Sequence, residues 1–446
     1  MISLIKKYDV PVPRYTSYPT VPAWDLTGFA KDGYESRVRA AVKEAQDGIS
    51  LYIHLPYCES LCTYCGCNTR ITINHKVERP YIEAVIAEWK LYLEVFDGEP
   101  VIREIHLGGG TPTFFSPENL KYLIESILET AQVHKDYQFS FEGHPNNTTF
   151  EHLQALYEVG FTRVSFGVQD VDFKVQKAIN RLQPIENLEK VTKWARSIGY
   201  TSVNFDLIYG LPFQTLYGIK NTIDVVESLM PDRIAFYSYA HVPWTRPGQR
   251  AYSEEHIPMG TEKHKLNIVG QALLKAIGYE AIGMDHFALP NDTLTKARGT
   301  GRLHRNFMGY TESRTSCMIG LGVSSISDIG TAYAQNVKSV EGYREIVEKG
   351  ELPVFKGHLL TKQELKTKEV ILDIACNGLI QLNDFLNLSE EKRESLMDMV
   401  GDGLLEKFCL NYRVTAKGMN FLRNICSIFD EYYQTEQGEK QFSQAV

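Results

Sequence analysis

Long apolar runs are missing from this sequence. No stretch approaches the roughly 20 apolar residues that a bilayer-spanning helix needs. Residues 1–9 also lack the continuous apolar core and the small-residue cleavage site of a secretory signal peptide. Internal repeats, low-complexity tracts and blocks of like charge are missing as well. We therefore expect a cytoplasmic protein with no membrane partner, and we expect it to act as a monomer.

Positive charge is also scarce. The 446 residues include 47 Lys and Arg against 55 Asp and Glu, which gives a net charge of −8. That sign disfavours a protein that binds phosphate backbones, so we expect no nucleic-acid partner, and an anionic small substrate would need a local basic pocket. With 43% hydrophobic residues the chain can bury a sizeable core. Its length allows about two to four domains, or one large enzyme domain with appendages.

The cysteines do not form the evenly spaced framework of a secreted, disulfide-bonded protein. Four of the eight lie within ten residues, at positions 58, 62, 65 and 67. The other four are isolated, namely Cys317, Cys376, Cys409 and Cys426. We interpret these four as small core or surface residues in a reducing compartment.

Short β-rich runs alternate with longer segments of helical period in the middle of the chain. The runs are 51–55, 104–107, 138–142, 163–168, 202–208 and 233–239. The helical segments include 81–93, 118–130, 185–197 and 219–229. Strand, helix and strand in repetition predict parallel βαβ units. Several of the runs end in Gly, Pro or polar residues, where a parallel α/β barrel places its chemistry.

The two ends of the chain differ from this middle part. Four prolines near the N-terminus prevent a long helix there; they are Pro11, Pro13, Pro19 and Pro22. From about residue 360 the hydrophobic spacing turns helical, over 362–376 and 390–407, with a short strand over 412–415. We therefore predict three parts. They are an extended arm over 1–45, a barrel catalytic domain over 46–359 and a small, mostly helical C-terminal domain over 360–446.

The clustered cysteines form the most specific pattern in the chain, Cys58-x3-Cys62-x2-Cys65-x-Cys67, directly after a predicted strand. A structural zinc site usually draws two separated cysteine pairs, and this chain has no second pair. Three cysteines on a short loop can bind three irons of a 4Fe-4S cluster and leave the fourth iron open as a reaction site. Cys67 is in principle a fourth ligand, but it would have to fold back onto a cluster already bound by Cys65.

This spacing resembles the radical S-adenosylmethionine (radical SAM) enzymes, and the additional Cys67 resembles their subfamily of oxygen-independent coproporphyrinogen III oxidases. Further motifs carry the same resemblance along the chain. They are Pro13-Arg-Tyr-Thr-Ser-Tyr-Pro-Thr20, Gly108-Gly-Gly-Thr-Pro-Thr113, Gly167-Val-Gln-Asp170, Asp206-Leu-Ile-Tyr-Gly-Leu-Pro212, Gly283-Met-Asp-His-Phe-Ala288, His304-Arg-Asn-Phe307 and Arg423-Asn-Ile-Cys426. The resemblance implies a partial (β/α)6 radical SAM barrel.

The resemblance also implies a set of site residues. The cluster ligands would be Cys58, Cys62 and Cys65. A SAM molecule on the open iron would contact Tyr52, Gly109, Glu142 and Ile326. A second SAM molecule would contact Tyr64, Gly110, Thr111, Gln169, Arg181, Asp206 and Ala240. Cys67 would be the catalytic residue near the reacting side chain; the alternative is a small packing residue beside the cluster.

The implied reaction is an oxidative decarboxylation. A 5′-deoxyadenosyl radical takes a β-hydrogen from the propionates on rings A and B of coproporphyrinogen III, and each propionate then loses carbon dioxide and one electron to become a vinyl group. An unidentified reductant and an unidentified electron acceptor would serve the reaction. Basic residues would bind the substrate carboxylates; the candidates are Arg14, Arg302, His304 and Arg305.

Two positions after Glu142 depart from the family pattern. The family commonly has a small apolar residue and an acid there, whereas this chain has Gly143 and His144. We interpret His144 as a solvated or backbone-bonded loop residue. Three alternatives stay open, namely a haem chaperone of the same superfamily, a related radical enzyme that modifies haem, and an iron–sulfur electron carrier. The chaperone usually lacks the fourth cysteine and the Arg-Tyr-Thr-Ser-Tyr arm, and the missing fourth ligand disfavours the electron carrier.

Overall fold

A curved parallel sheet forms the centre of the protein. The computed structural model describes residues 2–25, 29–313, 315–433 and 442–445. Six strands pair in parallel in chain order. They are β1 (Ile49–Leu55), β4 (Val101–Gly109), β5 (Gln132–Gly143), β6 (Phe161–Gln169), β7 (Ser202–Tyr209) and β8 (Arg233–Ser238). This confirms the predicted α/β class with a partial barrel of six parallel strands.

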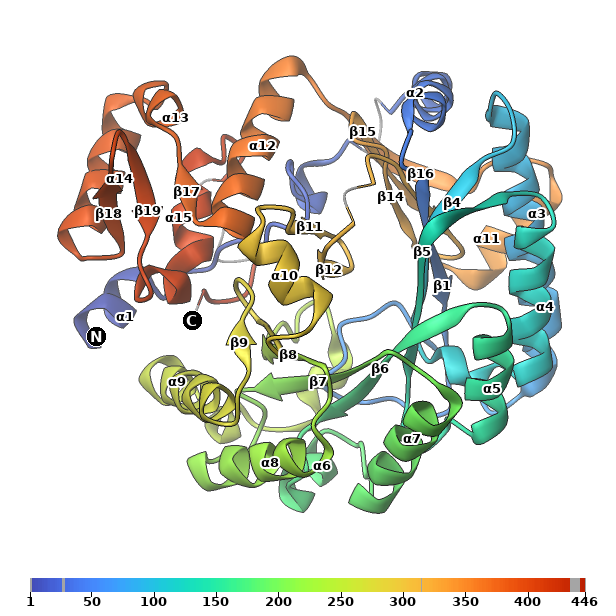
Figure 1. Cartoon of the computed structure of the whole chain (residues 1–446), viewed down its shortest axis with the longest axis horizontal. Coiled ribbons are helices and arrows are strands. Elements are labelled where there is room, and N and C mark those ends of the chain that lie inside the picture. The colour runs from blue at the N-terminus through green and yellow to red at the C-terminus, as the bar shows by residue number, and fades with distance from the viewer. Residues whose placement is uncertain (1, 26–28, 314, 434–441, 446) are drawn as a thin grey trace.

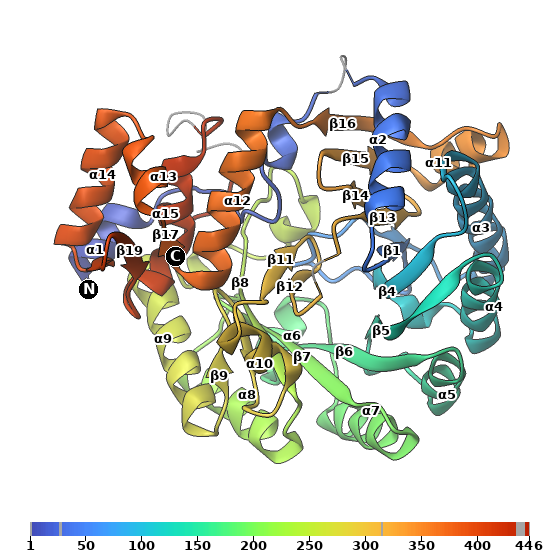
Figure 2. The same cartoon turned by 45° about the horizontal axis from the view of Figure 1, so that its top comes forward.

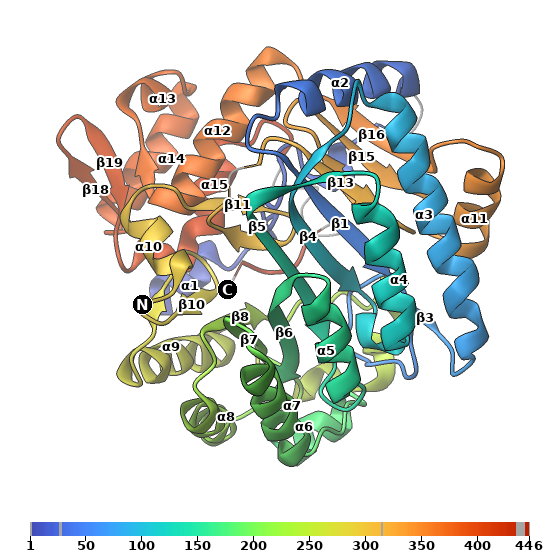
Figure 3. The ribbon, with the colours of Figure 1, turned by 45° about the vertical axis from the view of Figure 1, so that its right-hand side comes forward.

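The connecting helices cover the outer face of this sheet, as Figures 1 and 3 show. They include α3 (Glu78–Val95), α4 (Pro117–Leu128), α5 (Phe150–Glu158), α7 (Ile185–Ile198) and α8 (Leu216–Leu229). The sequence periods predicted α3, α4, α7 and α8 to within a few residues, whereas α5 was not predicted. Its N-terminus is a capping box in which Thr149 accepts from the backbone of His152 and the His152 side chain accepts from the backbone of Thr149.

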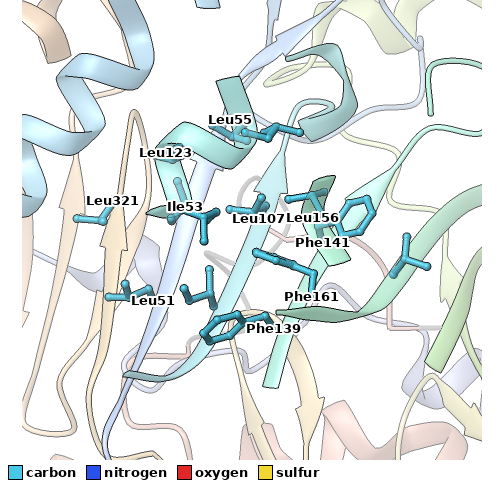
Figure 4. Close-up of a cluster of buried hydrophobic side chains, with 14 of the residues drawn as sticks. Leu51, Ile53, Leu55, Leu107, Leu123, Phe139, Phe141, Leu156, Phe161 and Leu321 are labelled. Carbon is cyan, nitrogen blue, oxygen red and sulfur yellow. The ribbon is translucent and has the colours of Figure 1, made fainter. Parts of the chain in front are cut away.

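The core lies between the helices and the outer face of the sheet. Side chains of a strand alternate between its two faces, and Leu51, Ile53 and Leu55 of β1 are all completely buried on the helix side. Figure 4 shows them beside apolar side chains of the next two strands and of two helices, Leu107, Phe139, Phe141, Leu123 and Leu156. The intervening residues of β1, Tyr52 and His54, point to the other face, so the alternation directs polar side chains into the barrel.

Further strands, most of them antiparallel, extend the sheet at both edges. On one side β13 (Met318–Leu321) pairs in parallel with β1 and is followed by β14 (Ile326–Asp328), β15 (Ala332–Asn336) and β16 (Val354–Leu359). On the other side β10 (His286–Ala288) and β9 (Glu280–Ala281) follow β8. A hairpin of β11 (His304–Asn306) and β12 (Gly309–Thr311) lies between these two sides (Figure 2). Its position narrows the opening of the partial barrel.

The N-terminal segment is not extended throughout, and this part of the prediction for 1–45 is wrong. It contains two helices, α1 (Ile2–Tyr8) and α2 (Lys31–Glu44). The prolines lie between them, and a proline restricts its own turn and the residue before it but not a helix that starts several residues later. Tyr15 and Tyr18 of the intervening stretch pack into the core of the C-terminal part, as does α1.

The C-terminal part is mostly helical and carries a small sheet. Its helices are α12 (Lys362–Asn377), α13 (Leu382–Leu386), α14 (Glu390–Gly401) and α15 (Leu422–Phe429). Strands β17 (Leu379–Ile380), β18 (Leu405–Phe408) and β19 (Asn411–Val414) form the sheet. The helix predicted over 390–407 ends at Gly401, because Gly403 adopts a positive φ of 72° and the chain turns into β18. The predicted division at residues 45 and 359 stays a prediction.

No helix in the described part of the chain combines the length and the apolar character needed to cross a membrane.

Candidate active site

A cavity of about 680 Å³ opens at the carboxyl ends of the parallel strands. The cysteine loop after β1, the glycine run after β4 and the ends of β5, β6 and β7 line it. Parallel strands end at the same rim of a barrel, which is where such folds bind their ligands. Twelve of the predicted site residues line this one cavity. They are Cys58, Cys62, Tyr64, Cys65, Cys67, Gly109, Gly110, Thr111, Glu142, Gln169, Arg181 and Asp206.

Backbone hydrogen bonds join the glycine run to the start of the cysteine loop. The Gly110 N–H donates to the Leu55 carbonyl at 2.8 Å, and the Thr111 N–H donates to the Tyr57 carbonyl at 3.0 Å. A Cβ on Gly110 would lie 2.5 Å from the carbonyl oxygen of Pro56. Only glycine allows this close approach, so the run fixes the position from which the cysteine loop departs.

The cysteine thiols lie close to other polar groups of the cavity. The Cys58 sulfur is 3.3 Å from the Thr111 hydroxyl, and Arg181 Nη1 donates to the Cys62 sulfur at 3.7 Å. The Cys67 N–H donates to the Cys65 sulfur at 3.4 Å. In the metal-free protein the Cys67 thiol hydrogen bond lowers the pKa of Cys65, and burial raises the pKa of Cys58 to about 11. Cation and N–H donors near sulfur favour the thiolate form that binds metals.

The arrangement of the thiols fits an iron–sulfur cluster better than a single ion. Among the described residues, no three His, Cys, Asp or Glu side chains are placed to surround one metal ion. In a 4Fe-4S cluster each cysteine binds a different iron, so the sulfurs do not have to converge on one point. The donor set of three cysteines on one short loop therefore fits the cluster that the spacing predicts.

Glu142 presents an ionised carboxylate to the cavity. Its Oε2 accepts from the Gly109 N–H at 3.3 Å, and its Oε1 lies 3.4 Å from His106 Nε2. Burial by itself would raise the pKa of Glu142, but the His106 hydrogen bond and the Gly109 N–H hold this pKa below its usual value. An ionised carboxylate such as that of Glu142 accepts hydrogen bonds and is suited to bind an ammonium group.

Arg181 lines the cavity from the loop after α6 (Phe173–Ala178), and Asp206 lines it from β7. Arg181 Nη2 donates to the Gly167 carbonyl at 2.6 Å, while its Nε is buried and has no hydrogen-bond partner among the described residues. Asp206 accepts from Ser165 at 2.9 Å and from Asn204 at 2.8 Å, and burial raises its pKa to about 6. A carboxylate bound in the cavity could pair with the unpaired Nε of Arg181. The two hydrogen bonds that Asp206 accepts hold its carboxylate in one orientation.

Three predicted site residues do not line this cavity. Tyr52 lies beneath Gly108, stacked on His106 with ring centroids 6.0 Å apart. The Ala240 carbonyl accepts from Gln249, whose amide also donates to the Tyr64 carbonyl at 3.0 Å. Ile326 begins β14, beyond the edge strand β13. The roles of these three residues stay predictions.

The structure adds residues that the sequence did not indicate. Tyr237 of β8 lines the cavity, and His106 orients Glu142. Both lie on inward-facing positions of strands, so strand alternation was the available signal. His144 also lines the cavity; its Nδ1 accepts from the Asn146 N–H at 3.1 Å, which confirms a backbone-bonded loop histidine. Burial and the charge of Arg181 lower its pKa to about 2, so His144 is neutral.

The structure separates the four basic candidates for substrate carboxylates. Arg14 and Arg305 line one small cavity. Arg302 is exposed and donates to Thr300 at 3.1 Å, and with His304 it lines a wide groove beside the C-terminal part. His304 also borders a cavity of about 340 Å³ that includes Arg305. The four candidates therefore do not share one site; Arg14 lines a cavity with Arg305, and His304 lines one cavity with Arg305 and another with Arg302.

Comparisons with known proteins agree with this geometry. Residues 52–226 match the model of the radical SAM superfamily. The chain is 36% identical to oxygen-independent coproporphyrinogen III oxidase of a Synechocystis species, over 99% of this chain and 97% of the relative. It is also 36% identical to the enzyme of the same name from Escherichia coli, over 100% of this chain and 98% of the relative. A solved structure of coproporphyrinogen III oxidase from Escherichia coli, described as a radical SAM enzyme, matches with a TM-score of 0.89 and 34% identity over 97% of this chain and 99% of that chain.

Proposed function

The chain belongs to the family of oxygen-independent coproporphyrinogen III oxidases, and from this premise we propose that it converts coproporphyrinogen III to protoporphyrinogen IX. The reaction is an oxidative decarboxylation of two propionate side chains to vinyl groups. The observation that carries the proposal is the cavity at the strand ends, which collects the three spaced cysteines, the glycine run and the Glu142 carboxylate. The enzyme is an oxidoreductase.

Membership of the radical SAM superfamily implies a 4Fe-4S cluster and SAM. We assign the cluster to Cys58, Cys62 and Cys65, which leaves one iron without a protein ligand. When bound, the cluster supplies an electron to SAM, and SAM supplies the radical that removes a hydrogen atom from a propionate. The protein positions the reacting carbon and excludes water, because the radical chemistry belongs to the cofactor.

The first SAM molecule is assigned to the glycine and carboxylate side of the cavity. Glu142 is ionised and binds the ammonium group, while the Gly109 backbone allows the methionine part to approach closely. Tyr52 and Ile326 complete the set that the family resemblance implies. Tyr52 acts from beneath Gly108, where its ring supports the glycine run.

The second SAM molecule is assigned to the part of the cavity that Arg181 and Asp206 line. Arg181 binds its carboxylate through the Nε that now lacks a partner, and Asp206 accepts from ribose hydroxyls or an ammonium group. The remaining assigned contacts are Tyr64, Gly110, Thr111, Gln169 and Ala240. Gln249 supports this set because its amide joins the carbonyls of Tyr64 and Ala240. Cys67 is assigned as the catalytic residue, since its thiol lies at the cavity beside a cluster ligand.

We further propose a cytoplasmic monomer that receives electrons from a separate reductant and passes the vinyl electrons to a separate acceptor. Neither partner is nucleic acid or membrane.

The test uses anaerobically reconstituted protein with SAM, a chemical reductant and coproporphyrinogen III. Cys62→Ser should abolish iron binding, SAM cleavage and vinyl formation together, whereas Cys409→Ser, an exposed cysteine of the C-terminal part, should leave all three unchanged. Wild-type protein that binds haem but does not cleave SAM would favour the haem chaperone. Cleavage of SAM that changes haem but not coproporphyrinogen III would favour a haem-modifying enzyme.

A further inference from the structure

A small basic cavity of about 60 Å³ lies where the N-terminal arm, the ends of β7 and β8, the β11 strand and α15 meet. Arg14, Arg305 and Arg423 line it, and among the described residues that line it Asp285 carries the single carboxylate. Three guanidinium groups against one carboxylate leave the cavity with excess positive charge. Its remaining wall includes neutral amide side chains, which are also able to donate hydrogen bonds.

The three arginines have few anionic partners of their own. Within the described part of the chain, the hydrogen bonds of Arg423 all go to backbone carbonyls, among them Pro13 at 3.1 Å and Gln444 at 2.9 Å. Arg14 donates to the Ser238 carbonyl at 2.7 Å. Arg305 is buried, and its Nε and Nη1 have no hydrogen-bond partner among the described residues, although Nη1 lies 3.6 Å from Asp285. Buried donors without partners cost free energy unless a ligand pairs with them.

The lowered pKa values of two basic groups agree with an excess of positive charge in this cavity. Lys263 is buried beside the cavity, and burial together with the charges of Arg14 and Arg423 lowers its pKa to about 7. The pKa of Arg423 falls to about 9 because of burial and the charge of Arg14. Cations that disfavour one another at this site would all be stabilised by a bound anion.

The cavity adjoins the candidate active site through a short chain of side chains. Asp285 and His286 are 2.6 Å apart, and the His286 ring contacts Tyr237 edge to face, with centroids 5.7 Å apart. Tyr237 lines the cavity of the cysteines. Arg305 also lines the separate 340 Å³ cavity formed with the arm. The small cavity has a volume of about 60 Å³, several times the roughly 10–15 Å³ that one water molecule needs, so it has room for a carboxylate.

We propose that Arg14 and Arg305 bind one of the carboxylates that the tetrapyrrole keeps through the reaction, and so anchor the substrate while other propionates face the radical. This inference rests on the proposed function. Arg423 holds the arm and the C-terminal residues 443–445 around the cavity, and is a positioning residue. A group that never reacts can stay in this cavity while the tetrapyrrole presents its two reacting side chains.

The test compares Arg305→Gln and Arg14→Gln with the matched control Arg298→Gln, an exposed arginine that is not among the four candidates for the substrate carboxylates. The binding probes are coproporphyrin III, the oxidised form of the substrate, and its analogue in which the ring C and D propionates are amides. Dissociation constants of both compounds are measured by fluorescence. We expect each arginine variant to weaken binding of the acid by roughly 10- to 100-fold, as for a lost charge-assisted hydrogen bond. Iron content and SAM binding should stay unchanged.

Discrimination between acid and amide decides the assignment. Wild type and Arg298→Gln should bind the acid more tightly than the amide. Arg305→Gln should bind both alike, and Arg305→Lys should recover part of the difference. If Arg305→Gln fails to fold, as judged by circular dichroism, Arg14→Gln decides alone. Variants that keep wild-type affinity and wild-type discrimination would overturn the inference. Wild-type protein that cleaves SAM but leaves coproporphyrinogen III unchanged would refute the proposed function instead, and the binding constants would still judge the carboxylate site.

Discussion

Substitution of Gly110 by alanine should loosen the SAM cavity without removing the cluster. The added Cβ would lie 2.5 Å from the Pro56 carbonyl oxygen, whereas ordinary contact begins at 3.4 Å. The glycine run and the start of the cysteine loop must therefore separate by about 0.9 Å. That movement stretches the 2.8 Å bond from the Gly110 N–H to Leu55 beyond hydrogen-bonding range. Overpacking costs about 1–3 kcal/mol, and the lost bond adds about 0.5–1.5 kcal/mol.

The assay is SAM binding to anaerobically reconstituted protein, with iron content measured on the same sample. A displacement that costs about 1.4 kcal/mol in the bound state corresponds to a tenfold loss of affinity, so we expect Gly110→Ala to bind SAM at least about tenfold more weakly. The control is Gly299→Ala at the end of α10 (Thr293–Gly299), where an added Cβ meets nothing within 4 Å. If Gly110→Ala bound SAM as tightly as the control, the expected displacement of the glycine run would be wrong.

Three further predictions follow from the site and the core. Cys67→Ser should keep about four irons per chain and the spectral change on adding SAM, with turnover reduced roughly 10- to 100-fold; loss of the cluster would make Cys67 a fourth ligand. Each protoporphyrinogen IX should be accompanied by two methionines and two carbon dioxides, and one methionine per product would contradict two separate radical steps. Glu88 is buried and accepts from Gly322, Asn336 and Tyr343, and burial raises its pKa to about 7. The folded state therefore keeps a proton that the unfolded state releases near pH 4.5. The free energy of unfolding should fall by up to about 3 kcal/mol from pH 4.5 to 7. If denaturant titrations gave Glu88→Gln the same change of unfolding free energy with pH as wild type, this prediction would be wrong.

The strands and most barrel helices could be predicted because their signals are local. The apolar alternation in β1 and the helical spacing of α7 lie within single segments. The N-terminal helix α2 was missed because the prolines before it were taken to govern the whole segment. The end of α14 was misplaced because the turn at Gly403 depends on one backbone conformation that helical spacing does not indicate.

The residues of the candidate site also differ in whether a local sequence pattern indicates them. The three cysteines lie close together in the sequence, and the glycines of the run are consecutive, so each pattern could be recognised. His106 and Tyr237 could not be identified, since their role depends on which strand face turns inward and on which strands become neighbours. Arg423 meets Pro13 across 410 positions of the chain, and no local pattern predicts such a contact.

We infer that this cavity uses SAM to convert propionates of coproporphyrinogen III to vinyl groups. The most direct measurement is anaerobic incubation of reconstituted wild-type protein with SAM, a reductant and coproporphyrinogen III, followed by chromatography and mass spectrometry of the tetrapyrroles. We expect protoporphyrinogen IX, formed only when SAM and the cluster are both present. Coproporphyrinogen III recovered unchanged while SAM is cleaved would contradict it.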